Sequence, residues 1–271
     1  MSQYIQIEFK NISQEQSDIL VAQLSDAGFD GFEEGEQVLK AFISSDMYDE
    51  NLLKTISEPG KLNFSKTIIE ETNWNQLWES SFSPVVVGDF VAVRADFHEP
   101  IEGVKFEVVI TPKMSFGTGH HATTYLMMQQ MEQLDFAGKK VLDFGTGTGV
   151  LAILAEKLGA KKIVAIDNDK WSIENAAENI NRNACSKIDL LLADSANLQD
   201  KFDIILANIN KNVILDNLEI ISRQVTQRGY VLLSGLLTDD EQDILTRSRN
   251  FGLHFCLKAE RHNWLLLKLS P

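Results

Sequence analysis

A cluster of three alternating glycines constrains this 271-residue chain more than any other feature. The stretch VLDFGTGTGVLAILAEKLGA, residues 141–160, places Gly145, Gly147 and Gly149 between a short apolar run and an apolar segment of helical length. Glycine at such a junction permits positive φ and lets a ligand approach the backbone closely. Because open α/β sheets bind ligands at the carboxyl ends of their strands, the stretch predicts a ligand site there. A tight turn with close helix packing is the alternative explanation.

The spacing of these glycines distinguishes between classes of nucleotide site. The dinucleotide fingerprint is G-x-G-x-x-G, whereas this chain reads D-x-G-x-G-x-G from Asp143, with Val150 where the third glycine of the fingerprint would stand. The chain also lacks the lysine of G-x-x-x-x-G-K-[ST] at this loop, which argues against a nucleoside triphosphatase. The next expected strand ends in AIDND, and we expect Asp167 to accept hydrogen bonds from both hydroxyls of a ribose.

Strand and helix patterns alternate from about residue 121 to the end of the chain. Expected strands cover 141–144, 163–166, 190–192, 204–207 and 231–234, expected helices cover 123–134, 150–158 and 171–181, and an expected closing hairpin covers 253–258 and 264–269. Such alternation predicts an α/β fold with a mostly parallel sheet and helices on both faces. Ahead of it, residues 91–93 and 105–110 predict a two-stranded element.

The beginning of the chain predicts a separate, small α+β domain at residues 1–62. Expected strands cover 4–9, 38–44 and 66–70, with a weaker one at 31–36, and expected helices cover 15–26, after a Ser13 cap, and 49–56. This β-α-β-β-α-β order is typical of a ferredoxin-like domain. Trp74, Leu77, Trp78 and Phe82 fall at helical spacing and predict a linker helix in the region 63–80, which leaves 81–271 for the α/β domain.

Charge and composition restrict the partners. The net charge is −14, and residues 1–61 carry twelve acidic side chains against four lysines, which is −8 of that total. This predicts a basic protein partner and no direct nucleic-acid partner, since phosphate binding needs a basic face; solubility alone is the other explanation. We expect a cytoplasmic protein with no membrane partner, because the chain has no bilayer-length apolar run, no signal-peptide pattern, and only two cysteines, neither in a CxxC motif.

Together these motifs resemble the class I S-adenosylmethionine-dependent methyltransferases. Four further segments, NWNQLWESSFSPVVVG, MSFGTGHHATT, ILANINKN and VLLSGLL, are similar to the ribosomal protein L11 methyltransferase family (PrmA-type). The similarity runs through nearly the whole chain and is specific from about residue 72 onward. It implies a Rossmann-like, mostly parallel seven-stranded sheet and S-adenosylmethionine as the cofactor. It also implies methylation of lysine amines, and of an N-terminal amine, on a basic large-subunit ribosomal protein.

The resemblance also carries residue roles to matching positions. It implies that Thr124 and Gly145 contact the methionine part of the cofactor, that Gly147 lies close by, that Asp167 binds the ribose, and that Asn208 faces the methyl group and the incoming amine. Two further roles are inferred from position in the chain. Asp194, in LLADSANL, is a candidate partner of the adenine amino group, with an ordinary loop aspartate as the alternative, and Phe116 is expected to cover the cofactor.

Two loops depart from the family pattern. The family usually has F-G-T-G-T-H-P-T-T and A-N-I-L-A, whereas this chain has His120 and Ala122 in the first loop, and Asn210 and Lys211 in the second. The changes leave open a different basic protein or small-molecule acceptor, or a non-catalytic ribosome-assembly role. We name no catalytic acid or base, because bulk water can take the amine proton, and we expect no metal site. Of the adjacent pair His120 and His121, at least one is expected to be structural or to cap a helix.

Overall fold

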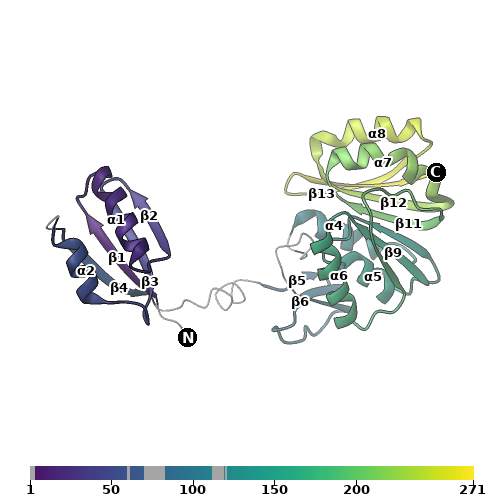
Figure 1. Ribbon diagram of the computed structural model, residues 1–271. Coiled ribbons are helices and arrows are strands. Elements are labelled where there is room, and N and C mark those ends of the chain that lie inside the picture. Colours follow the sequence, from purple (N-terminus) through teal and green to yellow (C-terminus); the bar gives the residue numbers. More distant parts are fainter. Residues whose placement is uncertain (1–3, 60–61, 70–82, 112–118, 120) are drawn as a thin grey trace. The chain divides into compact units, whose positions relative to one another are not determined.

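The structure is a computed structural model that describes residues 4–59, 62–69, 83–111, 119 and 121–271. The chain divides into two compact units, Met1–Ser81 and Phe82–Pro271, which are called the N-terminal unit and the C-terminal unit below (Figure 1). The residues that predict the linker helix, Trp74 to Phe82, lie outside the described residues. Of the expected linker region 63–80, only residues 63–69 are described, and 64–69 of these form a strand. In the described parts of the chain, no helix is both long and apolar enough to cross a membrane.

The N-terminal unit is a four-stranded sheet with two helices, in the β-α-β-β-α-β order that the sequence predicts. Its elements are β1 (Tyr4–Lys10), α1 (Gln14–Asp26), β2 (Gly31–Gly35), β3 (Val38–Ser44), α2 (Glu50–Ser57) and β4 (Phe64–Ile69), and the strand order is β2-β3-β1-β4 with all neighbours antiparallel. Ser13 caps α1 in a capping box, as expected. Because β4 pairs with β1, the unit continues past residue 62, where the sequence pattern places its end.

The core of the C-terminal unit is a seven-stranded sheet. In chain order its elements are α4 (Ala122–Met131), β8 (Lys140–Phe144), α5 (Val150–Lys157), β9 (Lys162–Asp167), α6 (Lys170–Arg182), β10 (Ile188–Leu192), β11 (Phe202–Asn208), α7 (Lys211–Gln224), β12 (Val225–Leu237), η1 (Thr238–Asp240), α8 (Glu241–Asn250), β13 (His254–Arg261) and β14 (Trp264–Ser270). The strand order is β10-β9-β8-β11-β12-β14-β13. Of these seven strands, β14 alone runs in the direction opposite to the other six, which confirms the mostly parallel sheet.

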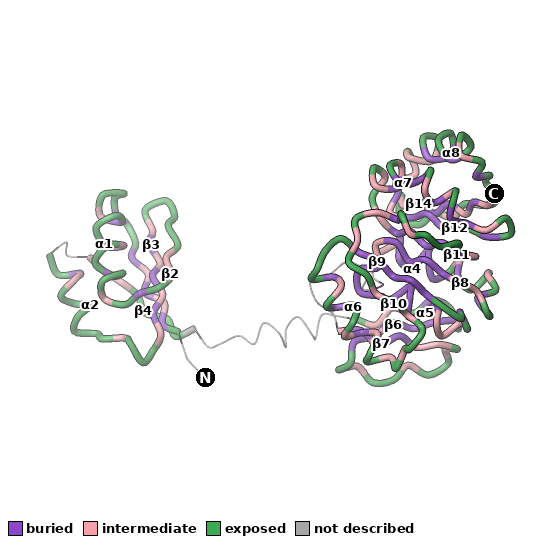
Figure 2. Tube along the Cα trace, turned by 45° about the vertical axis from the view of Figure 1, so that its right-hand side comes forward, coloured by how far each residue is buried: buried purple, intermediate pink, exposed green. Residues whose placement is uncertain are grey.

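Both faces of the central strands β8, β9 and β11 are buried, which explains why these strands read as continuous apolar runs, whereas the edge strands β10 and β13 are largely exposed. Along β8, Val141 belongs to the apolar cluster on the side of α4 and α5, and Leu142 belongs to the cluster on the side of α7 (Figures 1 and 2). The same alternation continues in β9, where Ile163 and Val164 lie in opposite clusters. Since β8, β9 and β11 are packed on both faces, the loops that follow these strands are anchored on a rigid base.

Two details differ from the sequence pattern. The element ahead of the main sheet has three strands, β5 (Val85–Val87), β6 (Val91–Ala95) and β7 (Phe106–Ile110), where two are expected. The strand β5 has only three residues, too few for an alternation pattern to emerge. The helix α4 ends at Met131, where 134 is expected, and the chain turns there toward the buried Phe136.

Candidate active site

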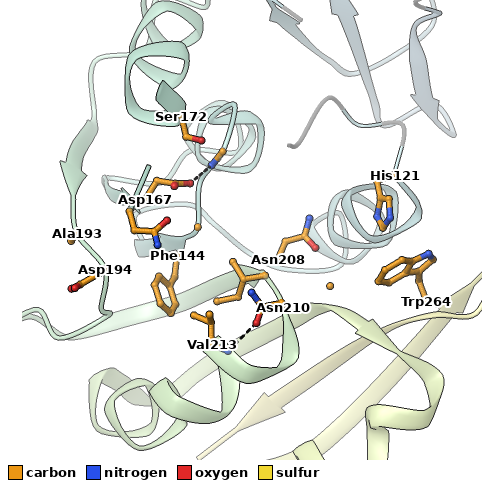
Figure 3. Close-up of a pocket in the computed structure, with 15 residues that line it drawn as sticks. His121, Phe144, Asp167, Ser172, Ala193, Asp194, Asn208, Asn210, Val213 and Trp264 are labelled. Atoms are coloured by element: carbon orange, nitrogen blue, oxygen red, sulfur yellow. Dashed lines mark hydrogen bonds between the residues drawn. The ribbon is translucent and has the colours of Figure 1, made fainter. Parts of the chain in front are cut away.

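A pocket of about 460 Å³ opens where the parallel strands of the main sheet end. Its volume falls within the roughly 300–1,000 Å³ of typical small-molecule sites. It is lined by His121, Phe144, Gly145, Gly147, Asp167, Asn168, Ser172, Ala193, Asp194, Asn208, Ile209, Asn210, Val213, Gly235 and Trp264. Figure 3 shows Asp167 and Asp194 at one end, called the acidic end below, and His121 and Trp264 at the other, called the aromatic end. Asn208 lies between the two ends.

The glycine loop after β8 is fastened to the end of β9. The backbone N–H groups of Gly145 and Thr146 both donate to the Ile166 carbonyl oxygen at 2.9 Å. Gly145 has φ +75°, a conformation that L side chains rarely adopt. One residue further on, the Gly147 N–H donates to Asp167 Oδ2 at 2.9 Å. Gly145 and Gly147 therefore present their backbone to the pocket, as the sequence predicts, whereas a Cβ on Gly149 would lie 3.4 Å from Ala176 Cβ, so this third glycine serves close packing against α6.

Asp167 is the link between the glycine loop and α6. It is 9% exposed, and its second oxygen, Oδ1, accepts from the Asp169 N–H at 3.0 Å, while Asp169 in turn caps α6. A carboxylate has about four lone-pair positions, so two backbone donors leave acceptor capacity for a ligand. The structure thus places a prearranged hydrogen-bond acceptor in the pocket wall at the position that the sequence predicts for the ribose.

A second carboxyl group, that of Asp143, forms a hydrogen bond with the same loop. Asp143 is fully buried, and Thr146 Oγ1 donates to its Oδ2 at 2.6 Å. Burial raises the pKa of Asp143 to about 7, an effect that the Thr146 hydrogen bond opposes and the nearby Asp167 charge reinforces. Asp143 is absent from the pocket wall, so its role in this structure is to hold the loop.

Asn208 is the last residue of β11 and lies at the middle of the pocket. One polar atom of its side chain has no hydrogen-bond partner among the described residues. Its Nδ2 donates to Thr124 Oγ1 at 3.2 Å, and Thr124 is fully buried on α4 behind the pocket wall. Asn208 Oδ1 is buried and has no hydrogen-bond partner among the described residues. Of the buried polar side-chain atoms that have no partner among the described residues, this oxygen belongs to a residue of the pocket wall, where a ligand can supply the donor.

Ile209, the residue after Asn208, packs closely against two glycines, Gly145 and Gly235. A Cβ on Gly145 would overlap Ile209 Cγ2, and a Cβ on Gly235 would overlap the Ile209 carbonyl oxygen. Gly235 has φ +82° and lies at the irregularity where β12 pairs with β14. The Ile209 N–H also donates to the Ser234 carbonyl at 3.1 Å. These approaches fix the backbone beside Asn208 and join it to the glycine loop.

The aromatic end combines the start of α4 with the start of β14. His121 caps α4, with Nδ1 2.7 Å from Thr123 Oγ1, which confirms the expected capping role for one member of the histidine pair. The His121 ring lies edge-on to Trp264, with 4.4 Å between ring centroids. Burial lowers the pKa of His121, which favours the neutral form of the ring.

The altered loops take different roles in the structure. Asn210 lines the pocket and caps α7, since its Oδ1 accepts from the Val213 N–H at 3.1 Å (Figure 3). Lys211 is absent from the pocket wall, and its Nζ pairs with Asp240 at 3.0 Å and Asp243 at 2.6 Å. Of the two changes in this loop, only Asn210 therefore alters the pocket.

Five of the seven expected site residues lie in this one pocket wall. They are Gly145, Gly147, Asp167, Asp194 and Asn208, while Thr124 is hydrogen-bonded to Asn208 from behind. Phe116 and His120 lie outside the described residues. Our sequence interpretation missed the pocket roles of Trp264 and Gly235. A signal for Trp264 existed, because an antiparallel final strand must begin at the edge where the parallel strands end.

Comparisons with known proteins agree with this geometry. Residues 3–270 match the family model described as ribosomal protein L11 methyltransferase (PrmA). The chain is 40% identical to the ribosomal protein L11 methyltransferase of Porphyromonas gingivalis, over 94% of this chain and 90% of that protein. It is 35% identical to the protein of the same name from Bacteroides fragilis, over 93% of each. A crystal structure of the ribosomal protein L11 methylase from Lactobacillus delbrueckii subsp. bulgaricus matches with a TM-score of 0.65 and 29% identity, covering 70% of this chain and 98% of that one.

Proposed function

This chain belongs to the ribosomal protein L11 methyltransferase (PrmA) family, and from that premise we propose the acceptor atoms and the residues that handle them. Membership makes it an S-adenosylmethionine-dependent protein methyltransferase. The acceptors are lysine ε-amines, together with an N-terminal amine, of ribosomal protein L11. The pocket of the C-terminal unit holds the cofactor and admits the amine.

The pocket residues fit the proposed cofactor. Asp167 offers free lone pairs to ribose hydroxyls at the acidic end, and the Gly145 backbone faces the pocket without a side chain. Asp194 is exposed in the pocket wall at the same end and is the proposed acceptor for the adenine amino group. When bound, S-adenosylmethionine supplies an activated methyl group on its sulfonium. Under this assignment the reacting methyl lies near Asn208, toward the aromatic end.

The observation that carries the proposal is that Asn208 Oδ1 is buried and accepts no hydrogen bond from the described residues. A free lysine has a pKa near 10.4, so it arrives as an ammonium ion that cannot attack. A neutral amine keeps N–H groups, and Asn208 Oδ1 accepts one of them and directs the nitrogen lone pair at the methyl group. In this structure Thr124 Oγ1 accepts from Asn208 Nδ2, so the amide oxygen is the atom that is left for the amine.

The aromatic end assists because the described residues that line it include no acid, lysine or arginine. Trp264 and a neutral His121 surround the amine with weakly polar surface, and such desolvation lowers the pKa of an ammonium group. The proton then leaves to bulk water before the amine attacks, so no side chain is required as a general base. Asn210 replaces an apolar wall residue with an amide whose Nδ2 is free to donate, because its Oδ1 caps α7.

The test is mass spectrometry of unmethylated ribosomal protein L11 after incubation with the full-length enzyme and S-adenosylmethionine. We expect mass gains in steps of one methyl group, mapped to lysines and the N-terminus, and strongly reduced gains with Asn208→Ala. Asn210→Leu, which restores the residue that the family usually has, serves as the matched control in the same loop. Absence of mass gain with cofactor binding intact would refute this acceptor, and the search would turn to another basic protein or to a small molecule.

A further inference from the structure

The helix α6 buries asparagine side chains on one of its sides. Asn175 and Asn179 are 1% and 0% exposed, and Asn183, the residue that ends the helix, is partly buried. Their spacing of four residues places all three on the same side of the helix. Burying an amide is costly unless its hydrogen bonds are made, so the partners of these side chains indicate what this side of α6 holds in place.

Two of the asparagines bind the backbone of β7. Within the described residues this strand pairs with β6 only, which leaves its other edge without a strand. At that edge, Asn183 Oδ1 accepts from the Val109 N–H at 3.0 Å, and its Nδ2 donates to the Val109 carbonyl oxygen at 2.6 Å. Two residues further along, Asn179 Oδ1 accepts from the Thr111 N–H at 2.7 Å. The two amides therefore satisfy backbone groups that a neighbouring strand would otherwise satisfy.

Asn179 also binds the glycine loop. Its Nδ2 donates to the Thr148 carbonyl oxygen at 2.9 Å. Thr148 lies between Gly147, which lines the pocket, and Gly149, which packs against α6. The packing partner is Ala176, three residues before Asn179 and therefore on the same side of the helix. The loop is thus fixed to α6 by one hydrogen bond and one close approach at consecutive residues.

The backbone of Gly147 is consequently held from two sides. Its N–H donates to Asp167, which in turn accepts from the Asp169 N–H just before α6 begins. The residue after it, Thr148, is held by Asn179 from the middle of α6. We propose that Asn179 is a positioning residue for the cofactor, which acts by fixing the glycine loop through the Thr148 carbonyl. The inference rests on the proposed function, because it takes this pocket as the cofactor site.

The competing explanation is that the asparagines only stabilise the fold. A buried backbone group without a partner destabilises a protein, so amides that satisfy the edge of β7 would be needed for that reason alone. This explanation predicts the same consequences for Asn179 and Asn183, since both bind this edge from the same side of α6. The positioning role predicts a difference, because the hydrogen bonds of Asn183 go to Val109 and to the Asn179 carbonyl and do not include the glycine loop.

The experiment compares Asn179→Asp with Asn183→Asp in the full-length chain. Each substitution keeps an oxygen that can accept from the β7 backbone and removes the N–H donor. The donor that is lost serves the Thr148 carbonyl in the first variant and the Val109 carbonyl in the second. Binding of S-adenosylhomocysteine is measured by calorimetry, and thermal unfolding and the KM for S-adenosylmethionine are measured on the same samples. Asp167→Asn is included as a reference for a pocket substitution.

We expect Asn179→Asp to weaken S-adenosylhomocysteine binding about tenfold, the size of effect that the loss of one buried hydrogen bond can produce. The KM for S-adenosylmethionine should rise by a similar factor, while kcat at saturating cofactor changes less than about twofold. Asn183→Asp should lose thermal stability and keep its affinity within about twofold. A variant that is only less stable has fewer folded molecules, which lowers kcat and leaves KM unaltered. If Asn179→Asp does not fold, Asn179→Ala and Asn183→Ala make the same comparison without an added charge.

Three results would overturn the inference. One is unaltered affinity in Asn179→Asp while Asp167→Asn binds more weakly, which would leave the proposed function in place. Another is an equal loss of affinity in Asn179→Asp and Asn183→Asp, which would assign both amides to the stability of the fold. The third is unaltered affinity in Asn179→Asp and in Asp167→Asn alike, which would overturn the inference together with the assignment of this pocket to the cofactor.

Discussion

The two ends of the pocket are built by different means. At the acidic end, Asp167 is held by the N–H groups of Gly147 and Asp169, so the backbone itself positions this carboxylate. At the aromatic end, the wall consists of side chains, with His121 and Trp264 contributed by elements far apart in the chain. Asn208 joins the two, since its backbone is fixed by strand pairing and its amide by Thr124.

This difference separates binding from transfer. A ligand part held by backbone-anchored groups should depend on those groups for affinity. A reacting amine held by a single amide oxygen between uncharged walls should depend on Asn208 for rate. Substitutions at the two ends should therefore change different measured quantities, and the following predictions test that separation.

The largest effect is expected at Asn208. Asn208→Ala removes the acceptor that orients the amine, and misalignment of this kind costs on the order of 100-fold in rate. We expect kcat to fall by about that factor, while the cofactor dissociation constant from calorimetry changes less than about threefold. Thr124→Ser, which keeps the hydroxyl group, should stay near the unaltered rate, whereas Thr124→Val should lie between. A parallel loss of cofactor affinity in Asn208→Ala would contradict the separation.

The second-largest effect is expected when Asp167 is replaced, and it should appear as an increase in the cofactor dissociation constant. Hydrogen bonds to a charged group contribute about 1.5–3 kcal/mol each, so Asp167→Asn should weaken cofactor binding by about 10- to 100-fold. Asp169→Asn is the matched control: it removes the same charge two residues away, keeps a capping side chain for α6, and is absent from the pocket wall. Equal affinities of the two variants would remove Asp167 from the ribose site.

A smaller effect is expected where Ile209 meets its two glycines. Gly145→Ala places a methyl group against the Ile209 side chain, so we expect about tenfold lower activity, partly restored by Ile209→Ala. Gly235→Ala collides with the Ile209 backbone, so the same second substitution should not restore it. Gly252→Ala has a similar φ, +77°, but open space around it, and should show only the roughly 1–2 kcal/mol of backbone strain. Urea unfolding and turnover measured on all variants check this pattern.

The same two ends differ in how far the sequence reveals them. The glycine loop, the strand β9 and Asp167 at the end of that strand lie within 30 residues, so strand-loop-helix patterns alone predict that the loop and Asp167 meet. Trp264 reaches the pocket only because β14 pairs antiparallel with β12, with Leu237 opposite Trp264. Gly235 looks like an ordinary strand residue until its contact with Ile209 is known. Such long-range pairings depend on the order of strands in the sheet, which local patterns do not specify.

The smallest effect is expected at Asp194, and it tests whether this side chain recognises the adenine at the acidic end. Its carboxylate is exposed, and an exposed hydrogen bond to a purine amino group contributes about 0.5–1.5 kcal/mol, so Asp194→Ala should weaken cofactor binding by only a few-fold. The decisive measurement is therefore the ratio of the affinities for two ligands that differ only at the purine amino group. S-adenosylhomocysteine carries the amino group and S-inosylhomocysteine has a carbonyl in its place. If Asp194 accepts from the amino group, the variant should lose affinity for the adenosyl ligand and not for the inosyl one. If both affinities fall equally, Asp194 acts only through its charge, and Asp167 remains the one side chain that defines this end.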